Sequence, residues 1–126
     1  MKTKKQMTGD WGEQKAVEFL QKNGYSVLER NFRTRKGEID IIATHQKVYH
    51  GQTLVFIEVK TRERDSGEAE RAVGKSKLQN LFQAAKTYCV QKNISVESTP
   101  IQFEEVSVIG VFPNVKNIKQ YIIPVE

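Results

Sequence analysis

Two acidic residues and a lysine interrupt apolar stretches of this chain, and their types and spacing suit chemistry. Glu58 and Lys60 close the run Leu54 to Thr61, whose β-branched and aromatic residues otherwise predict a buried strand. Asp40 interrupts a second apolar run, Gly37 to Ala43. Charges are rarely buried in a strand without a partner or a function, so these three residues are the first candidates for a site.

Two carboxylates and an ammonium group on neighbouring strands suit a divalent cation and a phosphate. Side chains alternate across a strand, so Glu58 and Lys60 share a face, and sequential strands are usually neighbours, which brings Asp40 close to Glu58. Mg²⁺ (or Mn²⁺) held by the two carboxylates would lower the pKa of a bound water and offset charge on a phosphodiester under attack. Lys60 would position the water or the phosphate.

Glu13 is a further candidate, as a ligand or a proton acceptor, if the helix that contains it packs over the site. Helix capping is the simpler explanation for Glu13. Ion pairs across the strands are the alternative for Asp40, Glu58 and Lys60 taken singly, but the whole set favours a site.

Basic residues border the expected site and suit a nucleic-acid backbone. The formal net charge is +5 and the pI is about 9.4, a weak indication of a polyanionic partner. Clusters lie just before Asp40 and just after the strand that carries Glu58, and solvated turns are the competing explanation. The expected phosphate contacts are Arg33, Arg35, Lys36, Arg62, Arg64 and, on a following helix, Lys77.

The elements that must position these residues form an α/β domain. Periodicity, capping signals and turn residues predict a mixed β-sheet flanked by helices, in the order α-β-β-β-α-β-β. The second helix joins two strands and suits a crossover between parallel neighbours. The expected helices are Trp11 to Asn23, with Asp10 and Glu13 as a capping box, and Ser76 to Lys92; the expected strands are Tyr25 to Phe32, Glu38 to Thr44, Thr53 to Thr61, Ile101 to Val111 and Ile118 to Val125.

Length and composition exclude several classes of protein. The 126 residues predict a single domain over 1–126, with 1–7 as a flexible basic tail. No apolar run reaches the length of a membrane span, and no secretory leader is expected. Cys89 is the only cysteine, which favours a reducing cytoplasmic compartment. Gly74-Lys75-Ser76 lacks the upstream glycine of a phosphate-binding loop, so no NTP partner is expected.

The ordered set of motifs resembles the YraN family of small bacterial proteins, within the PD-(D/E)XK nuclease superfamily that includes restriction endonucleases and archaeal Holliday-junction resolvases. The likeness spans about Trp11 to Ile109. Its motifs are Gly12-Glu13, Arg30-Asn31-Phe32-Arg33, Gly37-Glu38-Ile39-Asp40-Ile41-Ile42-Ala43, Val55-Phe56-Ile57-Glu58-Val59-Lys60-Thr61-Arg62, and Val73 with Lys77.

The resemblance implies a restriction-endonuclease-like fold and a metal-dependent endonuclease acting on DNA, with branched or structured DNA suggested by the resolvases. It implies Asp40, Glu58 and the backbone carbonyl of Val59 as metal ligands, Lys60 as the catalytic lysine and Glu13 as an additional acid. A homodimer would suit paired cuts. The family's Arg-Phe-Asp strand is replaced here by Gln102-Phe103-Glu104-Glu105, a departure. The alternatives are a catalytically silent nucleic-acid-binding module of the same fold and a protein-interaction domain with ion-paired strands.

Overall fold

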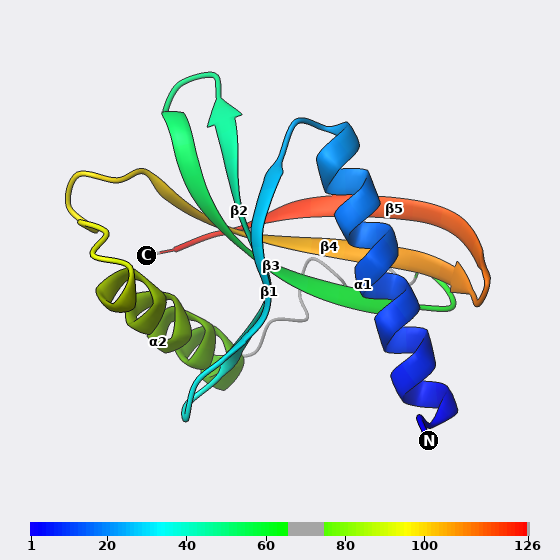
Figure 1. The fold of residues 1–126 in the computed structure, drawn as a ribbon. Helices are drawn as coiled ribbons and strands as arrows, with labels where there is room; N and C mark the ends of the chain where they lie inside the picture. Colours follow the sequence, from blue (N-terminus) through cyan, green and yellow to red (C-terminus); the bar gives the residue numbers. More distant parts are fainter. Residues whose placement is uncertain (66–74, 126) are drawn as a thin grey trace.

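Two helices and five strands make up the computed structural model, which describes residues 1–65 and 75–125 (Figure 1). The order of elements along the chain is the expected one. Gly74 and Val73 lie outside the described residues. The elements are α1 (Lys4–Lys22), β1 (Ser26–Arg33), β2 (Glu38–Lys47), β3 (Gly51–Arg62), α2 (Lys75–Gln91), β4 (Ile101–Val111) and β5 (Asn114–Ile123).

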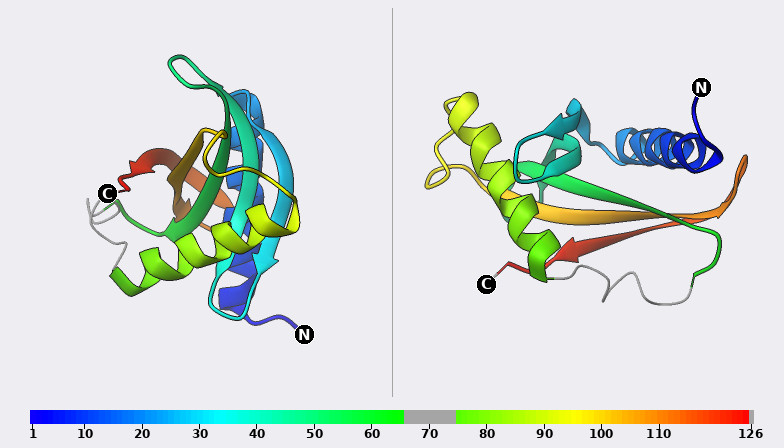
Figure 2. Two further views of the ribbon diagram at one scale, coloured as in Figure 1. Left: turned by 90° about the vertical axis from the view of Figure 1, so that its left-hand side faces the viewer. Right: turned by 90° about the horizontal axis from the view of Figure 1, so that it is seen from below.

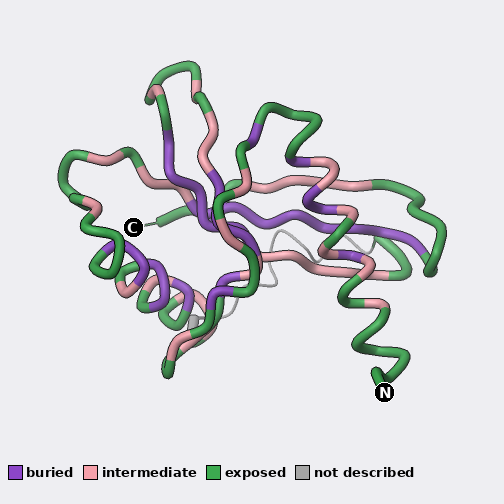
Figure 3. The backbone as a smooth tube through the Cα atoms, in the orientation of Figure 1, coloured by how far each residue is buried: buried purple, intermediate pink, exposed green. Residues whose placement is uncertain are grey.

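The strands form one mixed sheet whose spatial order follows the chain, β1-β2-β3-β4-β5. The first three strands pair antiparallel, as do β4 and β5. The central pair, β3 and β4, is parallel, and α2 makes the crossover between them, as the sequence predicts. The interior strand β4 is buried along most of its length (Figure 3).

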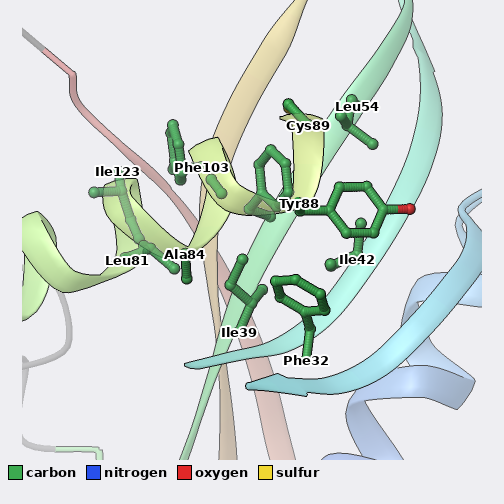
Figure 4. Close-up of a cluster of buried hydrophobic side chains, with 12 residues drawn as sticks. Phe32, Ile39, Ile42, Leu54, Leu81, Ala84, Tyr88, Cys89, Phe103 and Ile123 are labelled. Atoms are coloured by element: carbon green, nitrogen blue, oxygen red, sulfur yellow. The ribbon is translucent and has the colours of Figure 1, made fainter. Parts of the chain in front are cut away.

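The two helices pack on opposite faces of the sheet. Val55 and Ile57 of β3 belong to a core cluster with Ala16 and Leu20 of α1, whereas Phe56 between them faces α2. The strands lie between the two helices in the side views (Figure 2). The α2 cluster draws residues from every strand, and the largest group of buried aromatic rings lies there (Figure 4). Each face of the sheet is therefore closed by one helix.

The first helix begins earlier than predicted. It starts at Lys4, and its N-cap is Thr3, which forms a capping box with Gln6. The expected capping box of Asp10 and Glu13 is therefore wrong, and Lys4 to Met7 form helical turns. These turns are exposed and lack the periodic spacing of apolar residues from which a helix is predicted. Gly24 stops the helix in the left-handed conformation, as predicted, with φ at +86°.

The other elements differ from expectation only at their ends. β5 starts at Asn114 rather than at Ile118, because a short turn at Phe112 and Pro113 brings the chain straight back onto β4. It forms an edge of the sheet, and Pro124 follows its last residue, in agreement with the edge position expected for a proline. Neither described helix has the length and apolarity that crossing a membrane would require.

A buried polar network crosses the sheet on the α1 side. The Glu104 carboxylate, 1% exposed, accepts hydrogen bonds from the Tyr25 hydroxyl (2.6 Å), Lys47 Nζ (2.8 Å) and Gln120 Nε2 (2.5 Å). The Tyr25 ring stacks on His45, with the ring centroids 3.8 Å apart. The network links β2, β4 and β5 to the segment that follows α1, so it holds the first helix and the sheet together.

Candidate metal-binding and catalytic site

The candidate site lies where β2 and β3 separate. Their pairing ends at Ile41 and Ile57, yet β2 begins at Glu38 and β3 continues to Arg62. Beyond this point β2 pairs with β1 alone and β3 pairs with β4 alone. The two strands form a fork, and the predicted residues Asp40 and Glu58 are the first residues of its two arms.

A local irregularity in β2 turns Asp40 towards β3. Residues two apart in a regular strand share a face, but Ile39 packs on the α2 side and Ile41 on the α1 side. The Asp40 side chain between them reaches across the fork, where Oδ2 accepts a hydrogen bond of 2.7 Å from the Val59 amide. The bond closes the fork at its base and holds the carboxylate next to the strand that carries Glu58.

The Asp40 carboxyl group has a strongly raised pKa. Burial, the largest cause, and the negative charges of Glu58, Glu13 and Glu38 together raise the pKa of Asp40 to about 7, against the opposing effect of the Val59 amide. Two acids that repel each other in a partly buried position favour a bound cation. The expectation that Asp40 and Glu58 approach each other is therefore in agreement with their electrostatic coupling.

Replacement of Asp40 by asparagine should stabilise the metal-free protein at alkaline pH. Between about pH 4 and pH 7 the folded chain retains a proton on Asp40 that the unfolded chain releases, so stability falls as the pH rises through that interval. We expect the free energy of unfolding of Asp40→Asn to exceed that of the wild type by about 2 kcal/mol at pH 8 and to equal it near pH 4. Urea unfolding in the presence of EDTA measures both values. Equal stability at both pH values would contradict the raised pKa.

Glu58 is held by two lysines on the α2 face. Lys77 Nζ lies 2.6 Å from Glu58 Oε1, and Lys60 Nζ lies 3.4 Å from the same oxygen. Burial lowers the pKa of Lys60, and the neighbouring Lys77 lowers it further. Burial is the largest single influence on Lys77 and acts to lower its pKa, but the hydrogen bond to Glu58 and the other neighbouring groups together outweigh it and raise the pKa. The predicted pair of Glu58 and Lys60 on one face is confirmed by this contact.

Lys77 was expected at most to contact phosphate, and the structure instead brings it to the Glu58 carboxylate. It lies in the first turn of α2, and its side chain remains 42% exposed. Local residue spacing does not indicate this contact, because it depends on how the crossover helix docks. The Lys77 ammonium holds Glu58 Oε1, so a divalent cation that binds this carboxylate would compete with it.

Removal of the Lys77 ammonium should therefore tighten divalent-cation binding. Since a half-exposed ion pair contributes up to about 1 kcal/mol, we expect Lys77→Met to lower the Kd for Mn²⁺ about fivefold in isothermal titration calorimetry. Lys86→Met, at an exposed position on the same helix, is the matched control and should leave the Kd unchanged. An unchanged or higher Kd for Lys77→Met would contradict the competition.

Glu13 faces the same region from α1. Its Oε1 accepts hydrogen bonds of 3.0 Å from Arg30 Nε and from Asn31 Nδ2, which orient the carboxylate. The helix comes close to β3 at Gly12, where an added Cβ would lie 2.0 Å from Thr61 Oγ1. Only glycine permits this approach, and it brings the next residue, Glu13, towards the fork.

Asp40 and Glu13 line an open pocket of about 470 Å³ on the α1 side, whereas Glu58, Lys60 and Lys77 do not line it. It is polar, and residues from α1, β2 and β3 contribute to it. A second hollow of about 600 Å³ shares Gly9, Val59 and Thr61 with it and is bordered by Lys4, Lys5 and Lys60. The first pocket is lined by Lys2, Gln6, Gly9, Asp10, Glu13, Arg33, Asp40, Val59 and Thr61.

The predicted phosphate contacts fall into two groups. Arg35 and Lys36, at the turn between β1 and β2, and Arg64, after β3, are exposed. Arg33 is also exposed and lies 3.5 Å from Glu38. Arg62, however, donates a hydrogen bond of 2.8 Å to Ser107 and lies 3.8 Å from Glu105, with its side chain 20% exposed. It is therefore engaged with β4.

The donor set fits Mg²⁺ or Mn²⁺. No group of three His, Cys, Asp or Glu side chains within residues 1–65 and 75–125 forms a complete metal cage. Mg²⁺ does not need one, because it is commonly held by one or two carboxylates together with waters and substrate phosphates. Asp40 and Glu58 would supply the carboxylates, and Val59, which lines the pocket, would add its backbone carbonyl.

Comparison with known proteins gives a consistent result. Residues 12–111 match the family described as "Uncharacterised protein family UPF0102". A UPF0102 protein of Caldicellulosiruptor saccharolyticus is 42% identical over 114 residues, which cover 90% of this chain and 88% of the relative. One from Koribacter versatilis is 44% identical over 104 residues, covering 80% of this chain and 67% of the relative. The chain therefore belongs to the UPF0102 family, also known as the YraN family.

Proposed function

We propose that this protein is a metal-dependent endonuclease that hydrolyses phosphodiester bonds of DNA. The observation that carries the proposal is the fork between β2 and β3, which holds Asp40 against the Val59 amide and beside Glu58, with Lys60 3.4 Å from Glu58. This arrangement supports binding of one divalent cation by two carboxylates, with an ammonium group next to it.

Each residue has a separate task in the proposed reaction. When bound, the divalent cation supplies Lewis-acid activation of water and of the phosphodiester. Asp40 and Glu58 hold it, and Lys60 orients the attacking water or contacts a phosphate oxygen. Glu13 lines a pocket together with Asp40, and its carboxylate, fixed by Arg30 and Asn31, would receive a proton from the water.

Branched or otherwise structured DNA is the proposed substrate. The exposed Arg33, Arg35 and Lys36 lie at one end of the β1–β2 hairpin, close in sequence to Asp40, where they suit sequence-independent backbone contacts. A homodimer would place two such sites for paired cuts. The competing function is a DNA-binding module without turnover, which the engagement of Glu58 by Lys77 favours.

Cleavage of a labelled four-way junction tests the proposal. We expect the wild type to nick the junction in Mg²⁺ or Mn²⁺ and to stop when EDTA is added. Binding of the junction without nicking in either metal would instead establish the silent DNA-binding module.

A salt titration tests the nucleic-acid partner separately. If about four phosphates are contacted, the affinity for DNA should fall about 100-fold between roughly 50 and 200 mM salt. The double variant Arg35→Ala/Lys36→Ala should bind more weakly at low salt and show a shallower dependence, because two contacts are lost. Absence of binding at low salt, measured by fluorescence anisotropy, would exclude DNA as a partner of this protein.

A further inference from the structure

Glu105 of β4 carries a buried carboxylate that the proposed function leaves unused. Its side chain is 1% exposed, and neither carboxylate oxygen has a hydrogen-bond partner among the described residues. Arg62 Nη1 remains 3.8 Å from Oε2 and donates its hydrogen bond to Ser107 instead. A buried carboxylate without hydrogen bonds is costly, so the ion pair with Arg62 alone leaves this group unsatisfied in the metal-free protein.

The sheet places Glu105 beside the candidate site. In the parallel pairing of β3 and β4, Glu58 is opposite Glu105 and Lys60 is opposite Ser107, so these side chains share the α2 face. The charges that act on Glu105 are those of Arg62, Lys60, Glu58 and Lys77. The carboxylate therefore lies next to Glu58 and within the electrostatic reach of both lysines.

A cation on Glu58 would leave Lys60 without its acceptor. In the metal-free protein, the Lys60 ammonium lies 3.4 Å from Glu58 Oε1, the oxygen that Lys77 also holds. A divalent cation bound at that carboxylate repels both ammonium groups. Lys77 is 42% exposed and can turn to solvent, whereas Lys60 is 27% exposed and must stay near the metal to act.

We propose that Glu105 is a positioning residue for Lys60: it accepts a hydrogen bond from the Lys60 ammonium when a divalent cation takes Glu58, and so keeps that ammonium in the site. This inference rests on the proposed metal site of Asp40 and Glu58. A second metal ion is the other use of a carboxylate here, but Lys60, Arg62 and Lys77 surround Glu105 with positive charge, which favours an ammonium partner.

A double-mutant cycle of Mn²⁺ affinity tests the inference without measuring cleavage. Isothermal titration calorimetry is carried out on the wild type, Glu105→Gln, Lys60→Met and the double variant. We expect Glu105→Gln to weaken Mn²⁺ binding about 10-fold when Lys60 is present, because the ammonium then stays on Glu58, and less than about twofold in the Lys60→Met background. Glu97→Gln, which removes an exposed acid in the loop after α2, should change nothing.

Equal weakening in both backgrounds would overturn the inference, since it would show only the through-space effect of one charge on the metal. A wild type that binds no Mn²⁺ would overturn the proposed function itself, and the inference with it. A crystal structure of the wild type with Ca²⁺ gives a second measurement that needs no variant. We expect Lys60 Nζ within about 3.2 Å of a Glu105 oxygen; Lys60 directed away from Glu105 would overturn the inference.

Discussion

Asp40→Ala should abolish junction cleavage, with a loss of at least about 10³-fold, while the protein still folds and binds DNA in Ca²⁺. Alanine removes one of the two carboxylates at the fork and the hydrogen bond to the Val59 amide. The pKa of Asp40 is raised, which means that the folded protein favours the neutral carboxyl group. The fold therefore does not depend on the charge of this residue. Initial rates of nicking under single-turnover conditions measure the effect.

Lys60→Ala should reduce cleavage as severely, because it removes the ammonium beside Glu58. Glu97→Ala, which truncates an exposed acid outside the fork, should cleave at the wild-type rate. Cleavage of equal rate by Asp40→Ala and the wild type would mean that the activity belongs to a contaminant. Loss of Ca²⁺-supported DNA binding by both variants would instead place these residues in binding rather than in chemistry.

Lys47→Met should lower the free energy of unfolding by about 2–3 kcal/mol, a large effect for a position away from the site. Lys47 is 18% exposed and donates hydrogen bonds to Glu104 and to the Tyr25 hydroxyl, so its removal leaves the Glu104 carboxylate without its counter-charge. Urea unfolding at neutral pH measures the change.

The double variant Lys47→Met/Glu104→Gln provides the control for this buried pair. Once the carboxylate is neutral, loss of the lysine should cost less stability. The decrease in the free energy of unfolding of the double variant should therefore be smaller than the sum of the two single decreases by about 1 kcal/mol or more. Lys116→Met, at an exposed position of β5, should change stability by less than about 0.5 kcal/mol. Strict additivity would show that the buried ion pair contributes little.

The sequence predicted the order of elements and that Asp40, Glu58 and Lys60 lie close together, because both follow from periodicity and strand order. Alternation along a strand was enough to place Glu58 and Lys60 on one face, and the chain order of the strands was enough to bring Asp40 near them. The start of α1 was missed, although Thr3 and Gln6 carry a capping-box pattern, because the turns that follow have no apolar period.

The remaining features of the site depend on packing between distant segments. The contact of Lys77 with Glu58 requires the docking angle of α2, and the position of Glu105 beside Glu58 requires the register of a parallel pair. Neither is encoded by local spacing. Arg62 was expected at phosphate, but its hydrogen bond to Ser107 results from the same strand register. Strand alternation and strand order therefore predicted which residues lie close together, whereas the contacts that depend on long-range register were not predicted.

The most direct test of the central claim is the anomalous difference density of a crystal soaked in Mn²⁺. We expect one peak between the carboxylates of Asp40 and Glu58, next to the Val59 carbonyl, with Lys77 withdrawn from Glu58. A peak elsewhere, or a Glu58 carboxylate still held by Lys77 with no manganese at saturating concentration, would contradict the proposed metal site and the nuclease function that depends on it.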